Sequence, residues 1–179
     1  MSKRILILSG SPRKGGNSDT LCDRFMEGAQ DSGHAVEKIA LRDLSIAACR
    51  ACDYCKQHHG ECVQKDDMAG VLQAMMAADV IVMATPVYFY TMNAQMKGLI
   101  DRCVATYTQL IDKEFYIILS AADTDISHME RTVEGFRGFF SCLPGARERG
   151  IIYGIGAWNR GDILRSPSMQ EAYEAGKGV

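Results

Sequence analysis

The chain has 179 residues, 47% of them hydrophobic, which is enough for one domain of ordinary size with a substantial core. Its 20 Lys and Arg residues nearly balance 22 Asp and Glu residues, so we expect neither nucleic acid nor a membrane surface as a partner. The chain enters a strand without an apolar signal region, and no apolar run approaches a membrane span. We therefore expect a cytoplasmic protein in which residues 1–179 form one domain.

Apolar strands alternate with amphipathic helices along the chain, which is the pattern of a parallel sheet covered on both faces. The second expected strand is the most polar, so we place it at an edge of the sheet. The strands are predicted near residues 4–9, 35–41, 79–84, 115–121 and 151–155. Apolar stripes predict core-facing helices around residues 21–29, 68–75, 96–104 and 129–143, followed by a short helix at 169–175.

A loop rich in hydroxyls and glycine joins the first strand to the first helix. It reads Ser9-Gly10-Ser11-Pro12-Arg13-Lys14-Gly15-Gly16-Asn17-Ser18. The unpaired amides and the positive dipole end of a helix can hold a phosphate here without a metal. The loop matches neither the Walker motif nor the dinucleotide fingerprint Gly-x-Gly-x-x-Gly. We expect a phosphate-bearing cofactor; the alternative is an ordinary turn with Asn17 or Ser18 as the N-cap.

Four of the seven cysteines are crowded between the second predicted strand and the following helix. Thiolates at this spacing can each ligate one iron of a [4Fe-4S] unit, and ferredoxin-type runs open with the same Cys-x2-Cys-x2-Cys pattern. The alternatives are a structural zinc site, which more often uses two separated pairs, a thiol relay, or a motif that no longer holds metal. The four residues are Cys49, Cys52, Cys55 and Cys62.

The loop after the third predicted strand carries three consecutive aromatic residues. It reads Thr85-Pro86-Val87-Tyr88-Phe89-Tyr90-Thr91-Met92-Asn93. Ligands of a doubly wound sheet bind at the carboxyl ends of the strands, so this loop and the first one should converge. Flat rings at such a crevice suit a flat cofactor, although the rings of an aromatic run more often pack onto the core.

Together, the Ser-Pro-Arg loop and the Thr-Pro-Val-Tyr loop resemble those of the flavodoxin-like NAD(P)H-dependent FMN reductase superfamily, from the first strand to the last helix. The resemblance implies an α/β fold: a flavodoxin-like, doubly wound, five-stranded parallel sheet of order 2-1-3-4-5 with helices on both faces. It also implies FMN as cofactor and NAD(P)H as a possible electron donor. The residues implied at the FMN phosphate are Ser9, Ser11, Pro12, Arg13, Asn17 and Ser18. Those implied at the ring and ribityl chain are Pro86, Val87, Tyr88, Phe89 and Tyr90.

The cysteine-rich loop, at about residues 45–66, resembles the compact motif of the iron-sulfur flavoprotein family, which inserts it at the same place in the same fold. This resemblance implies a [4Fe-4S] cluster on the four cysteines and a homodimer or homotetramer. No catalytic side chain is required, because FMN carries the chemistry. Electrons would pass between FMN and the cluster, and on to a small-molecule or protein redox partner.

Three functions remain open from the sequence: an electron-transferring iron-sulfur flavoprotein, a cluster-free NAD(P)H-dependent FMN or quinone reductase, and a non-enzymatic metal-binding or thiol-sensing module. Two further groups are expected to be structural. Trp158 is expected to pack against a neighbouring subunit rather than to cover a ligand edge. Asp123, Asp125 and His128 are interpreted as part of a helix cap rather than as an acid-base site.

Overall fold

The computed structural model describes residues 2–179. The parallel strands follow the order β2-β1-β3-β5-β6, which confirms the flavodoxin-like order expected from the sequence, with β2 at one edge. The strands are β1 (Arg4–Ser9), β2 (Ala35–Ala40), β3 (Val80–Tyr88), β4 (Thr91–Met92), β5 (Glu114–Ser120) and β6 (Arg147–Gly154). The sheet therefore holds one short strand, β4, that the sequence pattern did not predict.

Strand β4 pairs with the end of β3, which runs four residues past the end predicted from the sequence. β3 reaches Tyr88, and the chain then turns back at Phe89 and Tyr90 to pair Thr91 antiparallel to Tyr88. Both turn residues have positive φ angles, 49° and 63°. A two-residue hairpin of this kind normally carries Asn-Gly or Gly, so an aromatic pair gives no sequence signal for it.

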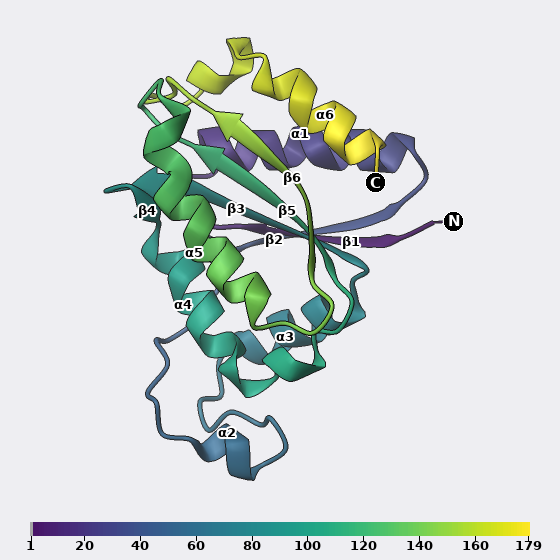
Figure 1. Cartoon of the computed structure of the whole chain (residues 1–179), viewed down its shortest axis with the longest axis vertical. Coiled ribbons are helices and arrows are strands. Elements are labelled where there is room, and N and C mark those ends of the chain that lie inside the picture. Colours follow the sequence, from purple (N-terminus) through teal and green to yellow (C-terminus); the bar gives the residue numbers. More distant parts are fainter. Residues whose placement is uncertain (1) are drawn as a thin grey trace.

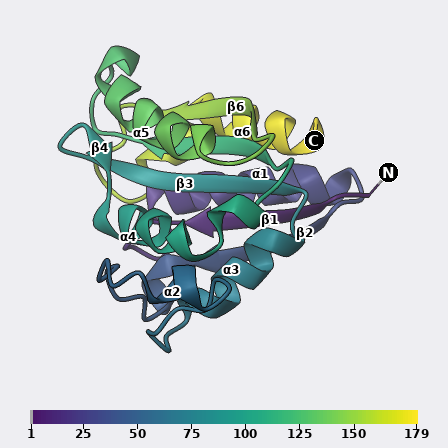
Figure 2. The same ribbon diagram turned by 60° about the horizontal axis from the view of Figure 1, so that its bottom comes forward.

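Helices cover both faces of the sheet, as predicted (Figure 1). On one face lie α1 (Asn17–Asp31) and α6 (Ser168–Lys177), and on the other lie α3 (Met68–Ala77), α4 (Ala94–Arg102) and α5 (Glu130–Ser141). The cysteine-rich segment, with the short helix α2 (Tyr54–Gln57), extends beyond α3 and α4 in both views (Figure 2). Short 3-10 turns occupy Leu41–Asp43, Cys103–Ala105, Tyr107–Gln109, Ile126–Met129 and Asp162–Arg165. Within residues 2–179, no helix has the length and apolar character needed to cross a membrane.

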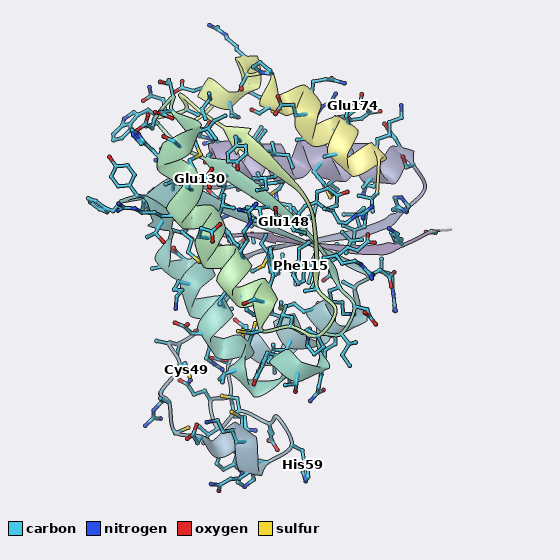
Figure 3. The ribbon with its side chains drawn as sticks, in the orientation of Figure 1. Cys49, His59, Phe115, Glu130, Glu148 and Glu174 are labelled. Carbon is cyan, nitrogen blue, oxygen red and sulfur yellow. The ribbon has the colours of Figure 1, made fainter. Side chains whose placement is uncertain are left out.

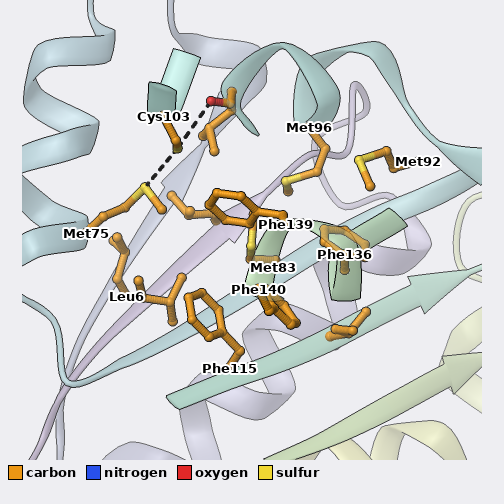
Figure 4. Close-up of a cluster of buried hydrophobic side chains, with 14 of the residues drawn as sticks. Leu6, Met75, Met83, Met92, Met96, Cys103, Phe115, Phe136, Phe139 and Phe140 are labelled. Atoms are coloured by element: carbon orange, nitrogen blue, oxygen red, sulfur yellow. Dashed lines mark hydrogen bonds between the residues drawn. The ribbon is translucent and has the colours of Figure 1, made fainter. Parts of the chain in front are cut away.

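Two apolar clusters form the core because side chains alternate between the faces of each strand. Along β1, Leu6 and Leu8 join the cluster under α3, α4 and α5, whereas Ile5 and Ile7 join the one under α1 and α6. In the larger cluster the rings of Phe115 and Phe140 stack with centroids 4.2 Å apart (Figure 4). The sheet is thus buried on both faces, which fixes its strands and the loops at their carboxyl ends.

Helices α1 and α6 pack at very close range through two glycines. A Cβ atom added at Gly28 would lie 2.0 Å from the carbonyl oxygen of Tyr173, and one added at Gly176 would lie 2.0 Å from that of Phe25. Real Cβ atoms do not approach backbone atoms so closely, so neither position accommodates a larger residue at this spacing. The glycines therefore set the distance between the two helices.

Candidate functional site

A cavity of about 350 Å³ opens at the carboxyl ends of β1, β3 and β5. It lies where the strand order reverses between β1 and β3, the place at which doubly wound sheets bind their ligands. The sequence-predicted residues that line it are Ser11, Arg13, Asn17, Ser18, Pro86, Val87, Tyr88 and Phe89. The structure adds Gly16, Ser120, Ala121, Ala122, Ala157 and Trp158, which the sequence prediction did not include.

The start of α1 presents polar groups to this cavity. Gly16 is the N-cap and provides no side-chain hydrogen bond, so the alternative in which Asn17 or Ser18 caps the helix is wrong. The hydroxyl of Ser18 is buried and has no hydrogen-bond partner among the described residues. Ser11 Oγ is engaged within the loop, donating to the carbonyl of Arg13 at 2.9 Å. The helix start therefore leaves one buried hydroxyl and its first amides for a ligand.

Asn17 holds the opposite wall of the cavity rather than pointing its amide into it. Its Nδ2 donates to the carbonyls of Ala157 and Asn159 at 3.1 and 2.9 Å. Its Oδ1 accepts from the amide of Gly161 at 3.2 Å. These bonds hold the loop that carries Trp158, a residue that lines the cavity and is 73% exposed. Trp158 thus lies at the edge of the cavity, in the position of the role that its sequence context made the less favoured of the two.

Ser9 and Pro12 lie away from the cavity lining. Ser9 is fully buried, and its hydroxyl donates to Asp19 Oδ1 at 2.8 Å, beneath the loop. Pro12 is exposed. Asp19 in turn accepts from the amide of Gly15 at 2.9 Å and pairs with Lys38 Nζ at 2.7 Å. The carboxylate of Asp19 therefore shapes the loop from behind, with Ser9 as one of its supports.

The pKa of Asp19 follows from this environment. Burial raises it, but hydrogen bonds from Lys38, Ser9 and the Gly15 amide outweigh burial and hold the pKa at about 2. Because the folded-state pKa lies below the ordinary value of 3.8, the stabilisation is present above pH 4 and is lost as the pH falls toward 2. The shift corresponds to about 2 kcal/mol of unfolding free energy.

Replacing Asp19 with Asn is therefore expected to destabilise the protein by at least about 2 kcal/mol at pH 6, because Lys38 is left without its buried partner. The difference from wild type should shrink as the pH is lowered toward 2. Urea unfolding at a series of pH values measures it. Asp23→Asn is the matched control, since Asp23 bonds the same lysine from a half-exposed position. Equal stability of wild type and Asp19→Asn at pH 6 would contradict the assignment.

The aromatic hairpin tip forms the third side of the site. Phe89 is 99% exposed, and both Phe89 and Tyr90 hold the left-handed backbone conformation that costs non-glycine residues about 1 to 3 kcal/mol. Asn93 fixes the base of the tip. Its backbone amide donates to Thr85 Oγ1 at 3.1 Å, and its side-chain Nδ2 donates to the carbonyl of Gly10. The strained tip is thereby tied to the loop after β1.

Tyr90 faces a neighbouring hollow of about 410 Å³ rather than the main cavity. There its ring meets the edge of His128, with centroids 5.6 Å apart, and His128 Nδ1 lies 2.6 Å from Asp123 Oδ2. The hydrogen bond to Asp123 raises the pKa of His128. Asp125 caps the following 3-10 turn by accepting from Ser127, as the sequence analysis expected.

All four predicted cysteine ligands line a second cavity, of about 270 Å³, in the segment beyond α3 and α4. Figure 3 shows Cys49 and His59 in this segment. Within residues 2–179, no three or more His, Cys, Asp and Glu side chains stand close enough to hold a single metal ion. Ala51, Asp53 and His59 have positive φ angles, so the backbone around the thiols is strained.

The sheet order, the loop at the start of α1 and the cavity at the strand ends define a flavodoxin-like α/β protein. Residues 3–157 match the NADPH-dependent FMN reductase family, and the chain belongs to that family. It is therefore a member of a family of flavin-dependent oxidoreductases, and the resemblance indicated by its two loops is confirmed.

Curated relatives match a little over half of the chain. An iron-sulfur flavoprotein of Archaeoglobus fulgidus is 40% identical over 100 residues, which cover 56% of this chain and 44% of that protein. An iron-sulfur flavoprotein of Methanosarcina thermophila is 38% identical over 101 residues, covering 56% and 52%. The chain thus spans about half the length of these curated relatives. An FMN-dependent NADH-azoreductase from Bacillus anthracis, solved in complex with FMN, shares the fold with a TM-score of 0.75 at 18% identity over 99% of both chains.

Proposed function

We propose that this protein is an FMN-dependent oxidoreductase whose flavin binds in the cavity at the carboxyl ends of β1, β3 and β5. The observation that carries the proposal is the buried hydroxyl of Ser18, which has no partner among the described residues and lies at the start of α1, where the N-cap Gly16 provides no side-chain hydrogen bond. A buried hydroxyl without a partner costs about 1 to 3 kcal/mol, which a bound anion would recover. The residues present fit a phosphate at this place.

The chain offers distinct groups to the two ends of FMN. Ser18, Arg13 and the first amides of α1 would hold the phosphate, while Asn17 positions the loop behind it. The segment 86–89 and Trp158 would flank the flat ring. Bound FMN would accept two electrons together as one hydride and could release them one at a time. In this assignment Ser9 does not contact FMN but supports the loop after β1 through its hydrogen bond to Asp19. Pro12 and Tyr90 lie outside the binding surface.

We infer NAD(P)H as the electron donor from the family description and from the exposed rings at the cavity mouth. Phe89 and Trp158 present flat apolar surface where a nicotinamide would approach the flavin. The same two exposed side chains, which both line the cavity, support a homodimer or homotetramer, because large apolar groups gathered at a site often mark an interface. A small molecule or a redox protein would accept the electrons.

We also propose that Cys49, Cys52, Cys55 and Cys62 hold a [4Fe-4S] cluster. The iron-sulfur flavoproteins named above support this, as does the fact that all four thiols line one cavity. Each thiolate of such a cluster ligates its own iron, so its sulfurs stand farther apart than the ligands of one ion. Four thiols at compact spacing around one cavity favour the cluster over zinc, which more often uses two separated pairs. One FMN-binding domain with a cluster-bearing loop at about 45–66 is the resulting organisation.

Protein purified without oxygen is expected to show flavin absorption bands together with a broad brown iron-sulfur absorption. Cys52→Ser should lose the brown absorption and the iron while FMN remains bound, because the two cavities share no residues. Cys142→Ser, which changes an exposed cysteine outside both cavities, is the matched control and should keep both. Absorption spectra and metal analysis measure the outcome.

The same measurements separate the alternative functions. Flavin bands without iron would make the protein a cluster-free NAD(P)H-dependent FMN or quinone reductase. We retain this second candidate because an FMN-dependent azoreductase shares the fold over the whole chain. Absence of both chromophores would refute the proposal and leave a metal-binding or thiol-sensing module.

A further inference from the structure

A buried arginine stands against the cysteine cavity. The guanidinium of Arg102 is only 2% exposed, and its NH2 donates to Cys62 Sγ at 3.5 Å. It also donates to both carboxylate oxygens of Asp66, at 2.6 and 2.9 Å, and to the carbonyl of Ala47 at 2.8 Å. Arg50 lines the same cavity from an exposed position. Arg102 is therefore a fixed, buried cation, whereas Arg50 is a solvated one.

Asp66 holds the guanidinium in place. The Arg102 hydrogen bonds lower the pKa of Asp66 to about 2, so the carboxylate stays charged at any ordinary pH. Asp66 Oδ2 also accepts from the amide of Ala47 at 3.0 Å. The Arg102–Asp66 pair thus holds the start of the cysteine-rich segment at Ala47. It also orients an N–H of Arg102 toward Cys62, near the end of the segment.

Arg102 is also the last residue of α4, whose N-cap is hydrogen-bonded to β3 and to the loop after β1. Asn93, the N-cap of α4, is hydrogen-bonded to Gly10 in the loop after β1 and to Thr85 in β3. Between these ends, Met96 and Leu99 are fully buried in the core. Nine residues of α-helix span about 13 Å. One rigid element therefore joins the base of the flavin site to the cation at the cysteine site.

We infer that Arg102 is a positioning residue that raises the reduction potential of an iron-sulfur cluster on these cysteines, by presenting a buried cation and an N–H donor to the Cys62 sulfur. The inference rests on the proposed function, since it requires the cluster. Each one-electron reduction adds one negative charge next to the guanidinium and changes no bond. Hydrogen bonds to ligand sulfurs and nearby positive charge stabilise that reduced state.

The test is a redox titration of iron-loaded wild type and variants, followed by absorption and electron paramagnetic resonance. Arg102→Gln removes the cation and should shift the reduction equilibrium about tenfold toward the oxidised form, which is about 59 mV for one electron. Arg102→Lys keeps the charge and should recover part of that shift. Asp66→Asn removes the neutralising carboxylate and should move the potential upward. Arg50→Gln is the matched control, because water screens an exposed charge.

The outcomes distinguish a failure of the proposed cluster from a failure of the role assigned to Arg102. Wild-type protein that takes up no iron overturns the cluster and this inference together. Iron-loaded variants that keep the wild-type potential overturn only the role of Arg102, and they would show that it merely fastens the loop. If Arg102→Gln does not retain iron, Asp66→Asn decides: an upward shift supports the inference, and an unchanged potential refutes it.

Discussion

Exchanging Asn17 for aspartate is expected to weaken FMN binding about thirtyfold, which corresponds to about 2 kcal/mol. The substitution is nearly isosteric, but it replaces the amide that donates to the carbonyls of Ala157 and Asn159 by an oxygen that repels them. The loop bearing Trp158 then loses its fastening to α1, and a negative charge enters beside the proposed phosphate position. Titration of the apoprotein with FMN, followed by flavin fluorescence, measures the change.

Asn159→Asp is the matched control for this prediction. It makes the same chemical change in the same loop, but the side chain of Asn159 is exposed and this residue joins the network through its backbone. FMN affinity should therefore remain within a few-fold of wild type. If Asn17→Asp binds FMN as the wild type does, the fastening of the loop has no part in binding. Equal losses of FMN affinity in both variants would show that the added negative charge alone weakens binding.

Replacing Gly28 with Ala is expected to destabilise the fold by about 3 kcal/mol. The new methyl group would lie 2.0 Å from the carbonyl oxygen of Tyr173, and backbone atoms cannot move aside as a flexible side chain can. Helices α1 and α6 must separate, which opens the cluster beneath them. For a chain of this length the melting temperature should fall by about 10 °C. Calorimetry and urea unfolding measure both quantities.

The same substitution at Gly138 should have the opposite sign. Gly138 lies exposed within α5, and an added Cβ there would meet no atom within 4 Å. Alanine then removes backbone freedom from the unfolded chain and should stabilise the protein by about 0.5 to 1 kcal/mol. A Gly28→Ala variant as stable as Gly138→Ala would show that the helix contact is looser than the structure describes.

The distribution of apolar residues was sufficient to predict the architecture. Strands such as 4–9 and helices such as 68–75 carry their own periodicity, so burial on both faces of a parallel sheet could be inferred locally. The loop before α1 and the spacing of the cysteines are likewise local patterns, and both point to chemistry before any folding is known. The two-residue strand β4 was missed because the backbone of Phe89 and Tyr90 adopts a conformation that aromatic residues rarely take.

The tertiary structure decided which of several similar residues lines a cavity and which supports the loop behind it. Ser9 and Ser18 both belong to the loop region, yet Ser9 bonds Asp19 beneath it while Ser18 keeps a buried hydroxyl without a partner among the described residues. Asn17 reaches a loop 140 residues away, and Arg102 meets a cysteine 40 residues before it. Such pairings leave no local periodicity, because they arise only when the sheet brings distant segments together. The sequence alone predicted the main strands and helices and suggested the kinds of site, and the packing of those elements decided which side chains line each cavity.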